Sequence, residues 1–204
     1  MAQYVAATRV PVQGRLPRAR GKIVSCAAGQ GAQFLDELAG LGVEVVVAEE
    51  PERLGRGGAI KFAARRRREQ GDVFALNGDE LVDVDFGAML ARHQQTEAAA
   101  TVAVARPASP FGVVELGDND VIMGFSEGGR IPYWVNCGVY VLSAEAIERF
   151  PERGDHESTT YPELAAEGRL RAYRHEGLWL TVNTPKELRR ADEHVSAHPE
   201  WLGA

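Results

Sequence analysis

Apolar positions along residues 22–105 alternate between two spacings, and these spacings predict strands separated by helices. Valine-rich apolar runs typical of buried strands occur at 23–27, 43–48, 73–76 and 101–105. Positions at helical spacing include Phe34, Leu35, Leu38 and Leu41, and further helices are expected at 60–69 and 86–95. This alternation predicts an α/β fold, a Rossmann-like, mostly parallel sheet with helices on both faces.

The pattern changes after residue 111, where short strands follow one another with Gly, Asp and Asn turns between them. These strands, expected at 113–116, 121–125 and 133–142, predict an antiparallel extension of the sheet. Beyond them the sequence predicts helices at 144–150 and 161–167, strands at 170–173 and 178–182, and a last helix. That last helix is expected to begin at Pro185, because Thr184 before it is a suitable N-cap.

The chain of 204 residues, 45% of them apolar, is long enough for one substantial core. We expect an irregular N-terminal arm over 1–21, where no period is sustained, and one domain over 22–204. The net charge of −6 is not that of a general nucleic-acid binder, so no nucleic-acid partner is expected.

The cysteines and the hydropathy of the chain favour a cytoplasmic protein with no membrane partner. Cys26 and Cys137 lie apart in separate apolar strands, a pattern that indicates buried thiols rather than a disulfide or zinc site. No apolar stretch reaches the roughly 20 residues that span a bilayer, and no signal peptide is recognised. The five histidines show no catalytic grouping.

The most informative segment runs from a glycine-rich turn to an aspartate that follows a strand. Leu54-Gly55-Arg56-Gly57-Gly58 precedes a helix, and a glycine turn in that place offers unpaired backbone N–H groups to an anionic ligand. Asp79 ends Asn77-Gly78-Asp79 just past an apolar strand, where a carboxylate can hold a cation. Both halves of a phosphate and metal site thus occur in one unit; a tight turn and a capping aspartate are the alternatives.

These residues resemble the sugar-1-phosphate nucleotidylyltransferases, which join an NTP and a sugar phosphate and carry the nucleotide-diphospho-sugar transferase fold. Later segments resemble successive landmarks of that family: Phe111-Gly112-Val113-Val114-Glu115, Phe125-Ser126-Glu127, Trp134-Val135-Asn136-Cys137-Gly138-Val139-Tyr140 and Trp179-Leu180-Thr181-Val182-Asn183-Thr184-Pro185. The resemblance covers about residues 22 to 190.

The resemblance implies a set of binding residues. It places the nucleotide against Leu54, Gly55, Gly57 and Gly58. It assigns the sugar to Gly112, Glu127, Asn136 and Gly138, with Glu157 either a further sugar contact or part of a helix cap. It gives Asp79 and Asn183 to the metal, expected to be Mg²⁺.

The chain also departs from the family pattern. The N-terminal G-G-x-G-T-R-x-x-P loop and the Pro-Lys pair that grip the phosphates are absent from this sequence. The family's Glu-Lys-Pro is Glu127-Gly128-Gly129 here, and Asn183 stands for a second metal aspartate. No catalytic side chain is therefore assigned.

The sequence is compatible with two functions. The first is transfer of a nucleotidyl group from an NTP to a hexose 1-phosphate with release of pyrophosphate, of the mannose-1-phosphate guanylyltransferase or glucose-1-phosphate thymidylyltransferase type. The second is a catalytically impaired subunit that binds a nucleotide sugar. The sequence leaves the oligomeric state open; a homo-oligomer is compatible with it, because the first strand of the family pattern is not recognised and an incomplete sheet edge favours association.

Overall fold

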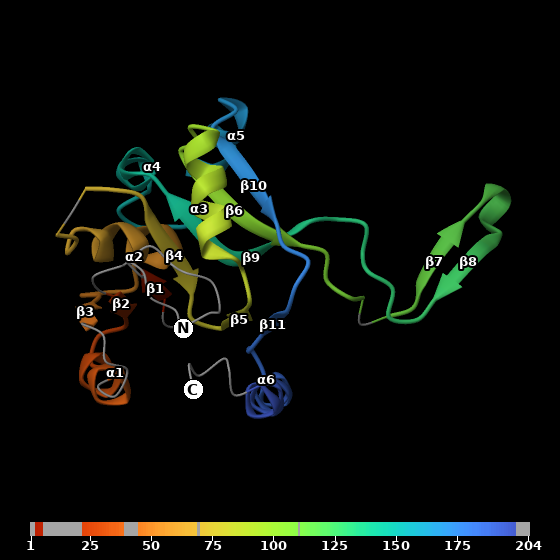
Figure 1. Ribbon diagram of the computed structural model, residues 1–204, viewed down its shortest axis with the longest axis horizontal. Coiled ribbons are helices and arrows are strands. Elements are labelled where there is room, and N and C mark those ends of the chain that lie inside the picture. The colour runs from red at the N-terminus through yellow and green to blue at the C-terminus, as the bar shows by residue number, and fades with distance from the viewer. Residues whose placement is uncertain (1–2, 6–21, 39–44, 69, 110, 199–204) are drawn as a thin grey trace.

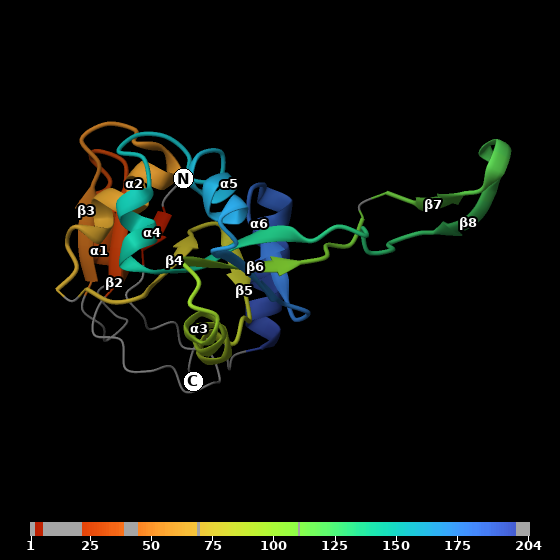
Figure 2. The ribbon, with the colours of Figure 1, turned by 90° about the horizontal axis from the view of Figure 1, so that it is seen from above.

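The computed structural model describes residues 3–5, 22–38, 45–68, 70–109 and 111–198. Its main body is a seven-stranded sheet with helices on both faces (Figures 1 and 2). Across the sheet the strands are β10 (Leu170–Arg174), β6 (Ala100–Ala105), β9 (Val135–Leu142), β4 (Val73–Asn77), β1 (Gln3–Val5), β2 (Lys22–Cys26) and β3 (Val45–Glu49). The predicted α/β class is confirmed.

Strand directions in this sheet follow from its pairings. β2 and β3 are parallel, as are β6 and β10, whereas β1 and β9 run antiparallel to both of their neighbours. In the described part of the chain, five of the seven strands therefore point the same way, which agrees with the predicted largely parallel sheet.

Helices cover the sheet on two sides. The helices are α1 (Gly31–Leu38), α2 (Gly55–Ala64), α3 (Phe86–Gln95), α4 (Ala144–Arg149), α5 (Thr160–Ala166) and α6 (Pro185–Ala197). Figure 2 shows α2, α4 and α5 on one face and α3 on the other. Each face has its own buried core, the first built around Ile60, Tyr140 and Leu164 and the second around Phe74 and Met89. None of the described helices is long and apolar enough to cross a bilayer.

Helix starts follow local capping chemistry. The Asp85 carboxylate accepts from Ala88 N at 2.9 Å at the start of α3, and Ser143 Oγ accepts from Ala146 N at the start of α4. Thr184 Oγ1 accepts from Glu187 N at 3.2 Å, with Pro185 at the first helical position, so the predicted start of α6 is confirmed.

Two segments differ from the sequence expectations. Gln3–Val5, inside the segment predicted to be irregular, forms β1 in the centre of the sheet, between β2 and β4. Such a short strand leaves no period to detect, and pairing on both sides fixes it. The remainder of that segment, 1–2 and 6–21, and Leu41 of the predicted apolar stripe lie outside the described residues. The division into arm and domain stays a prediction.

The strands of the predicted antiparallel extension form, but they divide between a separate hairpin and the main sheet. β7 (Val113–Leu116) and β8 (Ile122–Ser126) pair with each other as a hairpin that stands away from the body (Figure 1). It adds no strand to the main sheet, and only β9 enters that sheet. A separate two-stranded ribbon pairs β5 (Glu80–Val82), which the sequence pattern did not predict, with β11 (Trp179–Thr181).

Candidate functional site

The glycine-rich turn is the first turn of α2, five residues before the predicted helix start. Leu54 is the N-cap residue, and Gly55 has φ +77°, a conformation that favours glycine. Gly57 N and Gly58 N donate to the carbonyl oxygen of Gly154 at 3.0 and 3.3 Å. These two N–H groups are therefore satisfied within the protein.

The same glycines let the 152–156 loop pack directly on the helix start. A Cβ at Gly57 would lie 2.8 Å from His156 N, and one at Gly58 would lie 2.5 Å from Glu152 O. Both contacts are with backbone, which has no room to move aside. The structure thus gives these glycines a packing role, and their predicted contact with a nucleotide stays a prediction.

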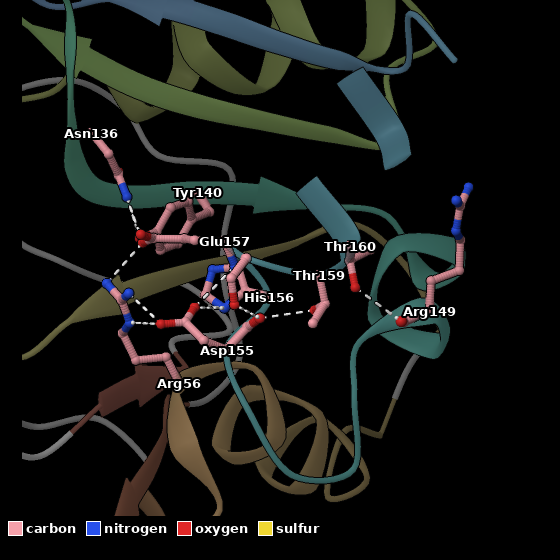
Figure 3. Close-up of polar contacts among 10 residues, drawn as sticks. Arg56, Asn136, Tyr140, Arg149, Asp155, His156, Glu157, Thr159 and Thr160 are labelled. Atoms are coloured by element: carbon pink, nitrogen blue, oxygen red, sulfur yellow. Dashed lines mark hydrogen bonds and ion pairs between the residues drawn. The ribbon is translucent and has the colours of Figure 1, made fainter. Parts of the chain in front are cut away.

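Arg56, between Gly55 and Gly57, joins the turn to two carboxylates of the loop. Its guanidinium donates to both Asp155 and Glu157, and Nη1 lies 2.9 Å from Glu157 Oε1 (Figure 3). Although burial acts to raise the pKa of Asp155, the Glu157 N–H and the Arg56 charge outweigh it, and the pKa lies below its usual range.

Glu157 is also held from the sheet side. Asn136 Nδ2 and Tyr140 Oη donate to Glu157 Oε1 at 2.8 and 3.1 Å, and Asn136 Nδ2 lies 2.8 Å from Tyr140 Oη (Figure 3). Asn136 and Tyr140 are four residues apart on β9, so their side chains share one face. The carboxylate and amide are fixed in orientation, and such groups discriminate between hydroxyl positions on a ligand.

Gly138 lies where β9 meets the end of β4. Its φ is +70°, and a Cβ there would lie 2.7 Å from Asn77 Nδ2 and 3.0 Å from Glu80 Cγ. Asn136 Oδ1 accepts from Gly138 N at 2.8 Å. The structure therefore brings Asn136 and Gly138 together, as the sequence predicts, and joins them to Asn77 beside Asp79.

Asp79 has one oxygen, Oδ1, that is buried and lacks a hydrogen-bond partner among the described residues. Asp79 O accepts from Val182 N at 2.8 Å, so the two predicted metal-binding segments meet. Asn183 is exposed, and its backbone N–H donates to Glu187 Oε2 at the cap of α6. No trio of His, Cys, Asp or Glu in the described ranges is arranged to hold a metal.

Glu80 adds a second carboxylate beside Asp79 that sequence reasoning missed. The pKa of Glu80 is raised to about 7, mainly by burial and also by the nearby Asp79 charge. The hydrogen bond from Trp179 Nε1 to Glu80 Oε2, at 2.7 Å, acts in the opposite direction. Trp179 thus makes a polar contact with Glu80 in addition to packing against the second core. The signal available in the sequence was the adjacency of two acids after a strand.

An open groove of about 370 Å³ runs along β6 and β10 and reaches the polar network. Asn136 and Glu157 line it together with apolar side chains, and Arg171 of β10 also lines it. Tyr161 closes part of the groove with a hydroxyl that has no hydrogen-bond partner within the described residues. A polar end and an apolar wall suit a ligand with hydroxyls on one side and C–H groups on the other.

Gly112 and Glu127 lie elsewhere. Both flank the first pair of the β7–β8 hairpin, Val113 opposite Ser126, and Glu127 is exposed. Figures 1 and 2 show this hairpin well away from the sheet, so the structure does not bring the two residues to Asn136 and Gly138. Their role in sugar binding stays a prediction.

Some members of the network were absent from the predicted set: Arg56, Tyr140 and Asp155. Arg56 and Tyr140 fall inside the motif segments themselves, but nothing in their spacing shows that a loop about a hundred residues later faces Arg56. Lys61 donates to the carbonyl oxygens of Glu148 and Phe150 and so ties α2 to the end of α4. Cys26 and Cys137 are buried and free, as predicted.

Comparison with known proteins shows the family to which the chain belongs. Residues 25–198 match the family described as Nucleotidyl transferase. A mannose-1-phosphate guanylyltransferase catalytic subunit beta from Danio rerio is 30% identical over 182 residues, 80% of this chain and 51% of that protein. The namesake from Dictyostelium discoideum is 28% identical over 72% of this chain and 43% of its own. The chain thus spans about half the length of the curated relatives it matches.

A solved structure shows the same fold. HddC from Yersinia pseudotuberculosis superposes with a TM-score of 0.66 at 20% identity, over 86% of this chain and 79% of that one. The sheet and its site define a domain of the nucleotide-diphospho-sugar transferase fold. Because the family match covers most of the chain, the protein belongs to the nucleotidyl transferase family.

Proposed function

We propose that this chain transfers a nucleotidyl group from an NTP to a hexose 1-phosphate and releases pyrophosphate. The observation that carries the proposal is the network of Glu157, Asn136 and Arg56, which opens on the groove. Since the curated relatives above are named mannose-1-phosphate guanylyltransferases, GTP and mannose 1-phosphate are the first substrates to test, ahead of dTTP and glucose 1-phosphate. A cytoplasmic location is part of the proposal.

In this proposal the sugar binds by its hydroxyls. Glu157 Oε2 carries no hydrogen bond to another described residue, whereas Oε1 takes three, so Oε2 remains to accept from a sugar hydroxyl. Asn136 holds Glu157 in place, and Gly138 allows the sugar to approach the backbone. Leu54 and Gly55 are proposed to contact the nucleotide from the helix side of the site.

Asp79 is the protein group proposed to hold Mg²⁺, with Asn183 beside it. The unpartnered Asp79 Oδ1 fits this role, because Mg²⁺ in such enzymes is commonly bound by one or two carboxylates together with substrate phosphates and water. When bound, the ion would neutralise the repulsion between the two polyanionic substrates.

The test is pyrophosphate release by the full chain with a panel of NTPs and hexose 1-phosphates in the presence of Mg²⁺. Asp79→Asn should lower kcat, and Glu157→Gln should raise KM for the hexose phosphate by roughly tenfold, the effect of losing one hydrogen bond to a charged group. Glu176→Gln, an exposed loop change of the same chemistry, should leave both constants unchanged. Turnover that is indifferent to Asp79→Asn and Glu157→Gln contradicts the assignment.

A second candidate function is a regulatory subunit that binds a nucleotide sugar without turning it over. It is favoured by one observation: the Arg56 guanidinium is already engaged by Asp155 and Glu157, which leaves it little charge for a phosphate. This function predicts that GDP-mannose raises the melting temperature by mass action while the substrate panel gives no pyrophosphate.

A further inference from the structure

Basic and aromatic side chains gather at one end of the groove, where the chain leaves β6 for the β7–β8 hairpin and returns to β9. Val104 of β6 and Ala172 of β10 line the groove, and Arg106 and Arg174 lie two residues further along the chain in each case. Arg174 pairs with Val104, and Val104 pairs with Asn136 on the next strand. Because paired residues point to the same face of a sheet, Arg174 continues the face that carries the polar network.

One indole ring contacts both arginines. The guanidinium carbons of Arg106 and Arg174 lie 5.0 and 5.2 Å from the centroid of the Trp134 ring, distances at which a ring face attracts a cation. Arg130 Nη1 donates to the carbonyl oxygen of Arg106 at 3.0 Å, which brings a third guanidinium group to the same place. A cation–π contact uses no N–H donor, so it orients the guanidinium groups and leaves their N–H groups to a ligand.

The arginine pair, Arg106 and Arg174, carries a positive charge that the described part of the chain does not balance. Neither side chain donates a hydrogen bond to another described residue, and neither forms an ion pair with a described carboxylate. Arg149 and Arg169, by contrast, each pair with a carboxylate. Like charges held together without a counterion favour an anion, and the planar guanidinium matches the oxygens of a carboxylate or phosphate.

The arginine pair lies on the far side of the sugar network from the group proposed to hold Mg²⁺. Gly138, Asn136 and Trp134 follow one another at intervals of two residues along β9 and the residue before it. Gly138 packs against Asn77, two residues before Asp79. At 3.3 Å per residue, Trp134 lies roughly 13 Å from Gly138, with Asn136 about halfway. A hexose ring is only a few bonds across, so a phosphate on C1 held beside Asp79 does not reach the arginines.

We propose that the arginine pair binds a second anionic group of the acceptor sugar, so that the substrate is an acidic hexose 1-phosphate. This group is a carboxylate or a further phosphate at the end of the ring remote from C1. Glu157 does not oppose it, because Glu157 Oε1 already accepts from Arg56, and Oε2 serves a hydroxyl in the middle of the site. The inference rests on the proposed function, since it names the acceptor of that reaction.

The first experiment is isothermal titration calorimetry of the full chain with Mg²⁺ and a GTP analogue whose α- and β-phosphates are joined by a methylene group, which prevents turnover. Mannose 1-phosphate is compared with mannose 1,6-bisphosphate, and glucose 1-phosphate with glucuronic acid 1-phosphate. At least one acidic sugar is expected to bind about tenfold more tightly than its partner, an advantage that shrinks with added salt. The pair with the larger gain distinguishes phosphate from carboxylate. Equal affinities within both pairs overturn the proposal.

The second experiment tests whether the gain comes from the arginine pair. Arg174→Gln and Arg106→Gln should each weaken binding of the acidic sugar about tenfold and leave the affinity for mannose 1-phosphate unchanged. The matched control is Arg66→Gln, which removes another exposed arginine stacked on an aromatic ring, Phe62 at 4.4 Å, and should change neither affinity. An equal loss for both sugars would mean that the arginines bind the 1-phosphate, and no loss for either would mean that they bind neither sugar. Both results overturn the proposal.

Turnover separates this inference from the proposed function. Tighter binding of an acidic sugar that depends on the arginine pair, without nucleotide-sugar formation from any NTP, would support the anion site and contradict nucleotidyl transfer. Turnover of mannose 1-phosphate with no preference for an acidic acceptor would support transfer and overturn the anion site.

Discussion

Replacing His156 with phenylalanine is expected to stabilise the protein and to remove much of its sensitivity to acid. The imidazole is fully buried and stacks on Phe150 at 4.6 Å between centroids, with the edges of Tyr140 and Tyr161 around it. Neither ring nitrogen has a hydrogen-bond partner among the described residues. Phenylalanine fits the same aromatic cage and leaves no buried N–H unpaired.

The magnitude follows from the histidine pKa. Burial lowers the pKa of His156 from 6.5 to about 4, with the Arg56 charge acting in the same direction and Asp155 opposing it. Between these values the unfolded chain binds the proton that the folded chain excludes, so the contribution is present above pH 6.5 and is lost as the pH falls towards 4. A difference of about 2.5 units corresponds to about 3 kcal/mol. Removing the unpaired N–H adds about 1–2 kcal/mol at neutral pH.

The assay is urea unfolding of wild type and His156→Phe at closely spaced pH values through this window. The difference between the two free energies of unfolding should grow in favour of the variant as the pH falls. Taking the difference cancels the pH dependence that comes from groups common to both proteins, including Glu80, whose pKa of about 7 lies close to this window. A variant with the wild-type slope, or one less stable at neutral pH, would show that the ring is charged or hydrogen-bonded in the fold.

Three further outcomes follow from the same contacts. Glu80→Gln should stabilise the protein by about 1 kcal/mol above pH 7, after allowance for partial exposure, and should have no effect below about pH 4.5. A carboxyl group whose pKa is raised in the folded protein makes the free energy of unfolding fall as the pH rises through that window. Thermal melts at the two pH extremes measure this effect. Gly58→Ala should destabilise the protein by about 1–3 kcal/mol, because the added Cβ overpacks against Glu152 O. The control is Gly71→Ala, whose Cβ meets nothing within 4 Å and which should leave stability unchanged or raise it. Equal melting temperatures of the two variants would contradict the packing role of Gly58. Tyr140→Phe should leave kcat nearly unchanged and raise KM for the hexose phosphate a few-fold, because Asn136 still holds Glu157. Steady-state kinetics measure both constants. A fall in kcat alone would contradict a role of Tyr140 in orienting Glu157 for sugar binding.

The sequence predicted elements best where many positions shared one period or one cap. The bounds of α3 agree with prediction because Phe86, Met89 and Leu90 repeat at helical spacing behind the Asp85 cap. β1 and β5 were not predicted, because a strand of three residues is too short to show a period. Both strands form by pairing with strands that are distant in sequence. The predicted start of α2 was five residues too late, because glycines favour a turn over a helix. The close packing of the 152–156 loop on Gly57 and Gly58 explains why these glycines lie in the helix.

The site was predictable only where its members were close in sequence. Asn136 and Gly138 come from one strand, so their proximity was implicit in the motif. The ion pair of Arg56 and Glu157 joins positions 101 apart, and no local pattern encodes it. Gly112 and Glu127 flank a hairpin whose strands pair only with each other, and spacing along the chain does not determine where such a hairpin lies relative to the main sheet.

The central claim is nucleotidyl transfer to a hexose 1-phosphate, and its most direct test is mass spectrometry of the reaction mixture. Full-length chain incubated with GTP, mannose 1-phosphate and Mg²⁺ is expected to yield a GDP-hexose whose formation requires both substrates and is lost in Asp79→Asn. If no nucleotide sugar forms with any NTP and hexose 1-phosphate pair, while GDP-mannose still stabilises the protein, the chain is a binding subunit and the claim of transfer is wrong.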